Sequence, residues 1–398
     1  MAGCRKTTMP WAQARAAARE LGGRRSWATE EDAAPADAVG AALARELTAL
    51  VAVPPYDASA MDGYAVAGPG PWNVRGRVLA GAAPAAALNP GEAVEIATGA
   101  RVPEGTDAVL PYEMAHREGD RVHGGAERGR HVRRTGEDTP AGATVLPQGT
   151  VVTPAVAGLA ASLGHDTLPV RRPRVAAFIT GDEIAVAGRP GPGQVRDAIG
   201  PMLPGIAAWA GAAPEAQVRL DDGLDHMVTA VAEAADRKSD VVVVCGASSK
   251  GPADHLRAAL AELDATLVVD GVACRPGHPQ LLAHFGTGES PGTVVVGLPG
   301  NPNAALAAAV TLLVPVLIAM SGRADPAALL PRALPLAGTV APHDRDTRLV
   351  AVRVADGVAR PVGHDRPGSL RGAAAADAYA VVPPGWTGPD ASLVWLPR

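Results

Sequence analysis

Aromatic residues are scarce in this chain of 398 amino acids, making up only 3% of it. Hydrophobic residues still reach 47%, so the cores must be built mainly from Ala, Val and Leu. Lysine is also rare: Lys6, Lys238 and Lys250 are the lysines, and the rest of the 36 basic residues are arginines. Together with an excess of Ala and Gly, this indicates a bias in codon usage, which matters wherever an Arg replaces an expected Lys.

Cysteine is rare too, and Cys4, Cys245 and Cys274 lie too far apart in the sequence to form a metal-binding motif. An odd number of cysteines without a disulfide framework fits a reducing compartment. The first residues contain no apolar run suitable for a signal peptide, so we expect a soluble, cytoplasmic protein. The most apolar stretch, Ala304–Met320, is short for a membrane span and contains Pro315, which predicts a buried helix and no membrane contact.

Several common functional motifs are missing. The sequence has no Walker A loop, no GxGxxG after a strand and no Gly-x-Ser-x-Gly elbow, and its ten histidines are scattered without metal-ligand spacing. The formal charge of −5 argues against a nucleic-acid partner, which usually requires a basic face.

The pattern of residues changes several times along the chain. Helical patterns lie at Trp11–Leu21, before the breaker Gly22-Gly23, at Ala36–Leu50 and at Thr153–Leu163. Between Trp72 and Val132, short Val-containing runs separated by Gly and Pro indicate a small β-rich unit. The last 70 or so residues again contain strand patterns, which are Leu349–Val354 with a hairpin signal at Asp356-Gly357, Asp377–Val382 and Leu393–Leu396.

An α/β unit begins at Arg174. Continuous apolar runs predict buried parallel strands, with helical patterns between them. The predicted strands are Arg174–Ile179, Asp240–Val244 and Thr293–Val296, and the predicted helices are Pro201–Gly211, Leu224–Arg237 and Pro252–Leu263. In an open α/β sheet the loops after such strands surround the ligand crevice.

Those loops are rich in acids. Carboxylates beside an anion-binding loop make most sense if a hard cation joins them to phosphate oxygens. The acids are Asp182, Glu183, Asp197, Asp221, Asp222 and Asp254. Any one of them alone is better explained as a helix cap or a solvated turn, and the functional interpretation depends on the whole set.

The stretch PPYDASAMDGYAV, residues 54–66, contains two of the four tyrosines of the chain. Its prolines exclude a helix interior, while Asp57, Ser59 and Asp62 can satisfy nearby backbone groups and Gly63 permits a positive φ. A surface turn explains these features. It does not explain why apolar and acidic residues alternate so closely between Ser59 and Tyr64.

This stretch resembles the signature of the molybdopterin molybdenumtransferase family, which includes MoeA and the E domain of gephyrin. Further segments resemble that family in the same order along the chain. They are Ile96–Val109, Gly136-Glu137-Asp138 with Gly142, Thr180-Gly181-Asp182-Glu183 and Gly297–Pro302. Several ordered motifs at plausible spacing make the resemblance specific.

The resemblance implies a multidomain α/β fold with an inserted β-rich lid and a C-terminal β-barrel. The expected domains are a connecting domain (1–22 and 134–172), the lid (23–133), a central parallel-sheet molybdopterin-binding domain (173–322) and the barrel (323–398). Family members are elongated homodimers whose active site lies between the α/β domain of one subunit and the lid of the other. With Mg²⁺ and molybdate they hydrolyse adenylylated molybdopterin, release AMP and leave molybdenum on the dithiolene. The molybdopterin adenylyltransferase is a further partner that the resemblance implies.

Residue by residue, the resemblance implies three overlapping sets. The catalytic acids would be Asp62, Asp138, Glu183 and Asp254. The metal ligands would be Asp62, Glu183, Asp254 and one of the pair Asp221 and Asp222, with Asp221 as the first choice. The substrate-binding residues would be Ser59, Thr98, Thr180, Gly181, Asp197, Asp221, Asp222, Ser249, Lys250, Gly251, Arg275, His278, Pro299, Gly300, Asn301 and Ser369.

Three loops depart from the family pattern. GGVSVG is replaced by GASSKG at 246–251, KPGKP by RPGHP at 275–279, and D-x-N by Asp197-Ala198-Ile199. His278 replaces a fixed positive charge, whereas Arg275 keeps one. Two hypotheses therefore remain: an enzyme that retains all the acids, or a divergent relative that binds molybdopterin or acts as a scaffold. Retention of the acids favours the enzyme.

Overall fold

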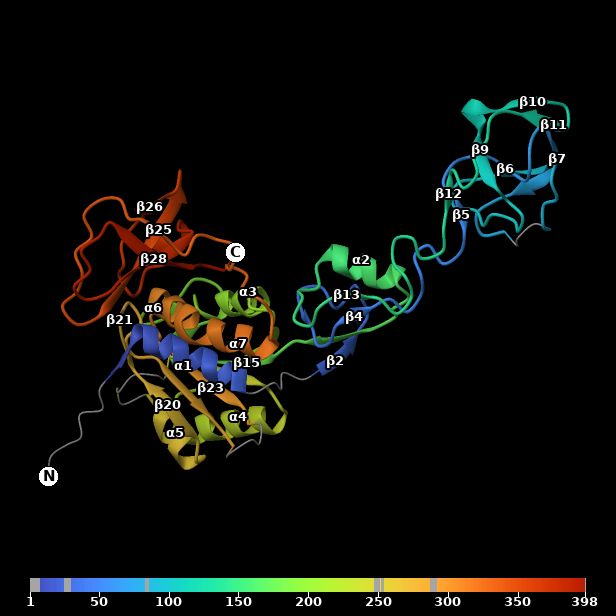
Figure 1. The fold of residues 1–398 in the computed structure, drawn as a ribbon. Helices are drawn as coiled ribbons and strands as arrows, with labels where there is room; N and C mark the ends of the chain where they lie inside the picture. Colours follow the sequence, from blue (N-terminus) through green and yellow to red (C-terminus); the bar gives the residue numbers. More distant parts are fainter. Residues whose placement is uncertain are drawn as a thin grey trace. The chain divides into compact units, whose positions relative to one another are not determined.

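The computed structural model describes residues 8–24, 30–82, 86–246, 251, 254–286 and 292–397 (Figure 1). The chain divides into two compact units. The large unit contains Met1–Arg45, Gln148–Thr153 and Leu168–Arg398, and the inserted unit contains Glu46–Pro147 and Pro154–Thr167. The domain boundaries that the resemblance implies stay a prediction.

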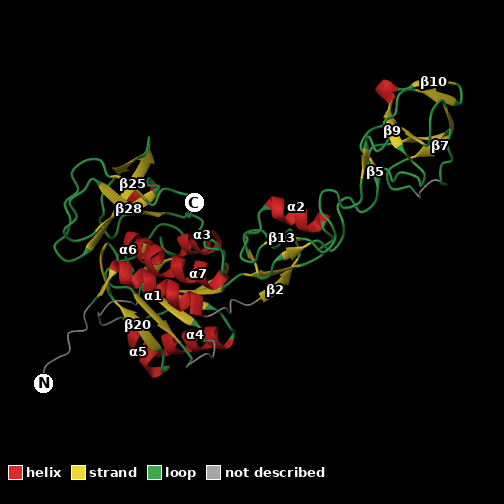
Figure 2. Ribbon diagram, viewed as in Figure 1, coloured by secondary structure: helices red, strands yellow, loops and turns green. Residues whose placement is uncertain are grey.

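The large unit is built on a six-stranded sheet covered by helices on both faces (Figure 2). Its strands, in spatial order, are β18 (Ala213–Leu220), β15 (Arg174–Thr180), β19 (Val241–Cys245), β23 (Val294–Leu298), β22 (Leu281–His284) and β20 (Thr266–Asp270). The first four are parallel, while β22 and β20 are added antiparallel at one edge. The predicted parallel strands are therefore confirmed, and they form part of a mixed sheet.

Alternation along the strands places helices on both faces of this sheet. Val241 and Val243 of β19 face a core shared with α1 (Trp11–Arg24), α3 (Leu203–Trp209), α6 (Pro302–Ala308) and α7 (Val314–Ser321). Val242 and Val244 face the opposite core, with α4 (Leu224–Asp236) and α5 (Leu256–Glu262). Because the central strands are covered on both sides, they contain the continuous apolar runs that made them recognisable in the sequence.

The predicted buried helix at 304–320 is confirmed, with a local irregularity. α6 and α7 are joined through a π-helical segment, Ala309–Leu313. Pro315 lies just after it, and a wider turn there accommodates a residue that lacks an N–H. Pro302–Ser321 is long and apolar enough to cross a membrane (mean hydropathy 2.3), but 83% of its most apolar window is buried inside the protein, as in a core helix.

Helix α1 packs on this irregular helix from the other end of the chain. Trp11 Nε1 donates to Thr311 Oγ1 over 3.0 Å, and Arg15 donates to the carbonyl of Val310. Burial lowers the pKa of Arg15 to about 10. Gly22 and Gly23 lie inside α1 and do not end it; the helix runs to Arg24, so the predicted breaker is wrong.

A second sheet of the large unit contains the C-terminal strands. Its order is β1 (Met9–Pro10), β21 (Val272–Arg275), β25 (Thr347–Ala355), β27 (Ala378–Val382), β28 (Asp390–Trp395) and β24 (Ala333–Pro335), with β26 (Val358–Pro361) also paired to β25. The predicted hairpin is confirmed, because Asp356 and Gly357 both have positive φ between β25 and β26. The remaining elements of the unit are the small sheet β2 (Glu30–Ala33), β14 (Leu168–Arg171), β3 (Ala42–Leu43), the pair β16 (Ile184–Ala185) and β17 (Val195–Arg196), and α8 (Arg371–Ala374).

The inserted unit is β-rich, as predicted. Its six-stranded sheet has the order β10 (His116–Glu118), β11 (Arg121–His123), β7 (Trp72–Val78), β8 (Glu92–Ile96), β6 (Gly63–Val66) and β9 (Ala108–Pro111). Two strand pairs complete it, β5 (Ala58–Ser59) with β12 (Val132–Arg133) and β4 (Leu47–Thr48) with β13 (Thr144–Leu146). The predicted helix at 153–163 is confirmed as α2 (Pro154–Ser162).

The helix predicted at 36–50 is wrong. The chain makes turns up to Gly40, which has φ +90°, and then forms the short strands β3 and β4. β3 pairs with β14 and β4 pairs with β13, so tertiary pairing overrides the helical preference of the Ala and Leu residues.

Candidate active site

The carboxyl ends of β15 and β19 meet in a close contact that requires glycine. The hydroxyl of Thr180 donates to the carbonyl of Cys245 over 2.9 Å. Gly246 has φ +106°, and a Cβ there would lie 2.7 Å from Thr180 Oγ1. Gly181 also has a positive φ, of +123°. The two loops therefore approach each other through bare backbone, which leaves their polar groups accessible at the end of the sheet.

A cavity of about 690 Å³ opens at this end of the sheet. Many of the residues that the sequence predicted for the site line it together, namely Thr180, Gly181, Glu183, Asp197, Asp222, Pro299, Gly300 and Asn301. Its charged lining residues are Arg196 and the three acids Glu183, Asp197 and Asp222. We refer to this space as the acidic cavity.

The three acids of the acidic cavity are not equivalent. Oδ1 of Asp197 accepts the N–H groups of Ile199 (2.9 Å) and Gly200 (3.0 Å), so this carboxylate is committed to the backbone. Ile199 itself is buried in the core, which explains how an apolar residue is accommodated in the Asp197-Ala198-Ile199 segment. Glu183 is exposed and Asp222 is half-buried. These two are the better candidates for contact with a ligand.

The structure distinguishes the neighbours Asp221 and Asp222. Asp222 lines the acidic cavity, and its N–H donates to Asp182 Oδ1 over 3.3 Å. Asp221 is exposed, and its Oδ1 lies 3.8 Å from Nη1 of Arg219 on the adjoining strand. Of the two alternatives left open by the sequence, Asp222 is the one that faces the cavity.

A second cavity, of about 630 Å³, adjoins the first across the turn Pro299–Asn301, which contributes to both. Arg275 and His278, which the sequence predicted to bind substrate, line this second space, as does Arg366. Arg275 Nε donates to Asp346 over 2.7 Å, and Asp365 accepts a 2.7 Å bond from Arg348. Both lining carboxylates are thus already paired. We call this space the basic cavity.

Arg366 and Arg196 were missed in the sequence. Asn303, on the first turn of α6, holds the loop that contains Arg366. Its N–H donates to the Pro367 carbonyl (2.9 Å) and its Nδ2 donates to the Arg366 carbonyl (3.2 Å). The available signal was an Arg in a Pro-Gly loop three residues before Ser369, a predicted site residue. Arg196, on β17, offered no comparable signal.

Each cavity is also lined by one buried thiol. Burial raises the pKa of Cys245 in the acidic cavity well above its ordinary value, and it raises the pKa of Cys274 in the basic cavity to about 12. Both thiols are therefore neutral at physiological pH and poor nucleophiles or metal ligands.

Other predicted residues of the large unit lie elsewhere. Asp254 is outside the described lining of both cavities, and its carboxylate accepts the N–H of Gly251. Ser369 follows Gly368, which lines the acidic cavity, and its Oγ accepts the N–H of Arg371 over 3.4 Å. Ser249 and Lys250 lie outside the described residues.

The inserted unit brings Asp62 and Thr98 together. Asp62 is exposed, and its Oδ1 accepts the N–H of Thr98 over 2.7 Å. Ser59 is buried, and its hydroxyl donates to the Met61 carbonyl over 2.6 Å, which shapes the turn. Gly63 does not adopt the positive φ that glycine permits, and glycine is required there because a Cβ would lie 2.1 Å from the carbonyl oxygen of Leu110. The predicted Asp138 is exposed and paired with Arg133.

The same acidic side chains decide whether the site could hold a metal ion. Within the described ranges, no group of three or more His, Cys, Asp or Glu side chains lies close enough to hold a metal ion. Mg²⁺, however, usually binds through one or two carboxylates plus substrate phosphates and water. Glu183 and Asp222 in the acidic cavity fit that smaller requirement.

Similarity to known protein families and solved structures shows the class of fold. Consecutive stretches match the MoeA N-terminal region (domain I and II; 9–164), a probable molybdopterin binding domain (176–319) and the MoeA C-terminal region (domain IV; 333–391). The crystal structure of a molybdopterin biosynthesis MoeA protein from Pyrococcus horikosii is similar, with a TM-score of 0.77 and 25% identity, covering 98% of this chain and 99% of that one. The chain therefore has the multidomain MoeA fold.

Curated relatives identify the family. Molybdopterin molybdenumtransferase 2 of Mycobacterium tuberculosis (strain ATCC 25618 / H37Rv) is 37% identical over 308 residues, covering 73% of this chain and 75% of that protein. The molybdopterin molybdenumtransferase of Bacillus subtilis (strain 168) is 33% identical over 368 residues, covering 87% and 84%. This chain belongs to the molybdopterin molybdenumtransferase family.

Proposed function

We propose that this protein is a molybdopterin molybdenumtransferase that acts in molybdenum cofactor biosynthesis. In the reaction, molybdenum from molybdate is inserted into adenylylated molybdopterin and AMP is released. The observation that carries this proposal is the pair of adjoining cavities on either side of the turn Pro299–Asn301. One is lined by Glu183 and Asp222, and the other by arginines and a histidine beside carboxylates that are already paired, which suits a reaction between two oxyanionic substrates that needs a cation.

The acidic cavity suits the phosphoanhydride of the substrate. The bare backbone at Gly181, Gly246 and Gly300 allows phosphate oxygens to approach closely. Glu183 and Asp222 would hold Mg²⁺ together with those oxygens. When bound, the ion would neutralise charge that develops at the breaking P–O bond.

The basic cavity suits the oxyanion. Arg275 and Arg366 supply fixed positive charge, and His278 supplies a further hydrogen-bond donor. Asp346 holds the Arg275 guanidinium and so directs its remaining N–H groups. We propose that molybdate binds here, one turn of chain away from the anhydride.

The proposal also covers the oligomeric state of the protein, its location in the cell and the source of its substrate. The functional form would be a homodimer in the cytoplasm, with Asp62 of one subunit acting on substrate held by the large unit of the other. The substrate would come from a molybdopterin adenylyltransferase. Family resemblance supports these points. The alternative of a non-catalytic binding protein is not favoured, because the curated relatives are named as molybdenumtransferases.

Adenylylated molybdopterin provides a direct test. The purified protein should release AMP from it in the presence of molybdate and Mg²⁺, and omission of either should suppress that release. Binding of adenylylated molybdopterin without AMP release, over a full range of molybdate and Mg²⁺ concentrations, would overturn the proposed activity.

A further inference from the structure

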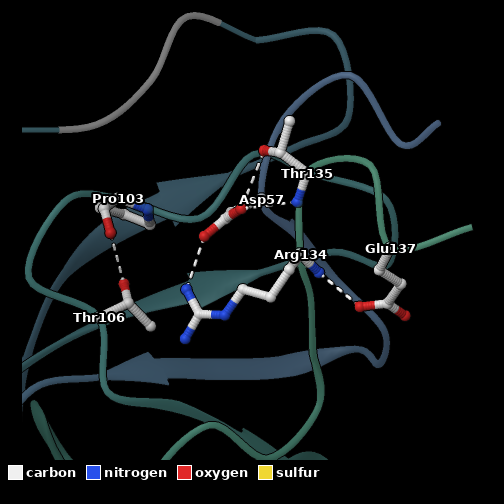
Figure 3. Close-up of polar contacts among 6 residues, drawn as sticks. All are labelled: Asp57, Pro103, Thr106, Arg134, Thr135 and Glu137. Atoms are coloured by element: carbon white, nitrogen blue, oxygen red, sulfur yellow. Dashed lines mark hydrogen bonds and ion pairs between the residues drawn. The ribbon is translucent and has the colours of Figure 1, made fainter. Parts of the chain in front are cut away.

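Asp57 lies at a junction of chain segments in the inserted unit (Figure 3). Its Oδ1 accepts both the N–H (2.8 Å) and the hydroxyl (2.9 Å) of Thr135, and its Oδ2 accepts a 2.6 Å bond from Nη1 of Arg134. These hydrogen bonds lower the pKa of Asp57, with the Thr135 N–H as the largest cause and Arg134 next. The carboxylate is therefore charged at neutral pH, when all three bonds are strongest.

The backbone around Asp57 is tied to another segment. The carbonyl of Asp57 accepts the N–H of Val102 over 2.9 Å, and the N–H of Ser59 donates to the carbonyl of Ala100 over 2.9 Å. The carbonyl of Ser59 in turn accepts the N–H of Gly99 over 2.8 Å. Thr98, the residue before Gly99, donates its N–H to Asp62. The side chain of Asp57 and its backbone thus join segments 57–62, 98–102 and 134–138.

Residues 134–138 are held by further hydrogen bonds of their backbone N–H groups. The N–H of Arg134 donates to Glu137 over 2.6 Å, the N–H of Gly136 to the Pro54 carbonyl over 2.9 Å, and the N–H of Asp138 to the Val53 carbonyl over 3.1 Å. Figure 3 shows the Arg134 side chain reaching the Asp57 carboxylate, while Glu137 lies at the backbone N–H of Arg134. Asp138 therefore lies at the end of a segment that is held both by Asp57 and by the carbonyls of Val53 and Pro54.

We infer that Asp57 is a positioning residue, whose carboxylate fixes the segments that carry Asp62, Thr98 and Asp138 relative to one another. The inference rests on the proposed function, in which Asp62 and Asp138 act on adenylylated molybdopterin. Asp57 itself does not touch the reacting atoms in this proposal. A misplacement of about 1 Å in a reacting group can cost a factor on the order of 100 in rate, so loss of this anchor is expected to lower kcat.

Asp107 provides a matched control. Its Oδ2 accepts the N–H of Gly68 over 2.8 Å and its Oδ1 lies 3.1 Å from Nε of Arg128, so it also anchors one backbone group and one arginine. Both side chains are 34% exposed. Asp107 joins segments that carry none of the predicted site residues. A general loss of stability should affect Asp57→Asn and Asp107→Asn alike, whereas loss of positioning should affect only Asp57→Asn.

The experiment compares the parent, Asp57→Asn and Asp107→Asn as full-length proteins. AMP release from adenylylated molybdopterin gives kcat and KM, and amide hydrogen exchange is followed in peptides covering 96–102 and 133–139. For Asp57→Asn we expect kcat to fall at least about tenfold, KM to change less than about threefold, and exchange to accelerate in both peptides. Asp107→Asn should retain kcat within about threefold and the parent's exchange in those peptides.

Equal losses of kcat in the two variants, or an unchanged kcat in Asp57→Asn, would overturn the positioning role. Failure of the proposed function would be seen differently, as absence of AMP release by the parent. The exchange data then still decide whether Asp57 anchors the three segments: faster exchange confined to Asp57→Asn supports the anchor, and exchange identical to the parent refutes it.

Discussion

The carboxylate of Asp62 and the backbone of Thr98 are joined by a 2.7 Å hydrogen bond, in which the Thr98 N–H donates to Oδ1. One oxygen of an exposed acid is thereby given a fixed direction by a neighbouring loop, while Oδ2 is left to other partners. Two residues that the sequence placed in the site for separate reasons therefore form one local structure.

Replacement of Asp62 tests its part in the chemistry. We expect Asp62→Ala and Asp62→Asn both to abolish AMP release, since neither supplies a carboxylate for a cation or an anhydride. Asp62 is exposed, so the loss of one hydrogen bond should lower the free energy of unfolding by no more than about 1.5 kcal/mol. AMP assays and denaturant unfolding would measure the two effects, and activity within a few-fold of the parent would remove Asp62 from the mechanism.

The neighbours Asp221 and Asp222 offer a second test with a built-in control. Asp222→Asn should raise the Mg²⁺ concentration needed for half-maximal activity about tenfold or more, because it removes one of the two carboxylates proposed to hold the ion. Asp221→Asn should have little effect, since Asp221 faces Arg219. A Mg²⁺ titration of AMP release distinguishes them. Equal shifts in both variants, or a shift only in Asp221→Asn, would contradict the assignment.

His278 tests the basic cavity. His278→Lys adds a charge that persists at neutral pH, which for one charge-assisted contact is worth about 1.5 kcal/mol or more. The molybdate concentration for half-maximal AMP release should therefore fall by about tenfold. His278→Gln, which keeps a donor but no charge, serves as the control and should not tighten binding. If Lys and Gln variants require the same molybdate as the parent, molybdate does not contact this position.

Gly22 and Gly23 form a natural pair for a stability test. A Cβ at Gly22 would lie 2.4 Å from the carbonyl oxygen of Val316, whereas one at Gly23 would meet nothing within 4 Å. Gly22→Ala should therefore lower the free energy of unfolding by about 1–3 kcal/mol through overpacking of α1 against α7. Gly23→Ala should raise it by about 0.5–1 kcal/mol, because alanine favours the helix. Urea unfolding with the sign of each change is the measurement, and the same sign for both would be contrary to this packing.

Particular elements show what could be predicted about the fold from the sequence and what could not. The central strands β15, β19 and β23 were recognisable because burial on both faces leaves an apolar run. The edge strand β18 was missed since most of its residues are exposed and its polar sequence contains no such run. Gly22 and Gly23 were taken for a breaker because a close helix contact 294 residues away cannot be seen locally.

In the candidate site too, residues in local motifs could be predicted from the sequence, whereas residues that depend on distant contacts could not. Ordered motifs located Glu183 and the turn at 299–301, since short segments carry their own signature, whereas the sequence left Asp221 and Asp222 as alternatives. Arg366 depended on the docking of a distant loop onto Asn303, and Asp57 on bonds to Arg134 and Thr135 some 77 and 78 residues away. Interactions of that range exist only once the chain has folded.

The bond between Trp11 and Thr311 spans 300 residues of sequence, and this separation has a consequence for how the protein is made. At roughly 5–20 residues per second, the ribosome completes α7 about 15–60 seconds after α1 has emerged. Over that interval the apolar stripe of α1 has no native partner, while the inserted unit, encoded almost wholly by residues 46–167, can already acquire its structure. The large unit must therefore close last, around a helix made first.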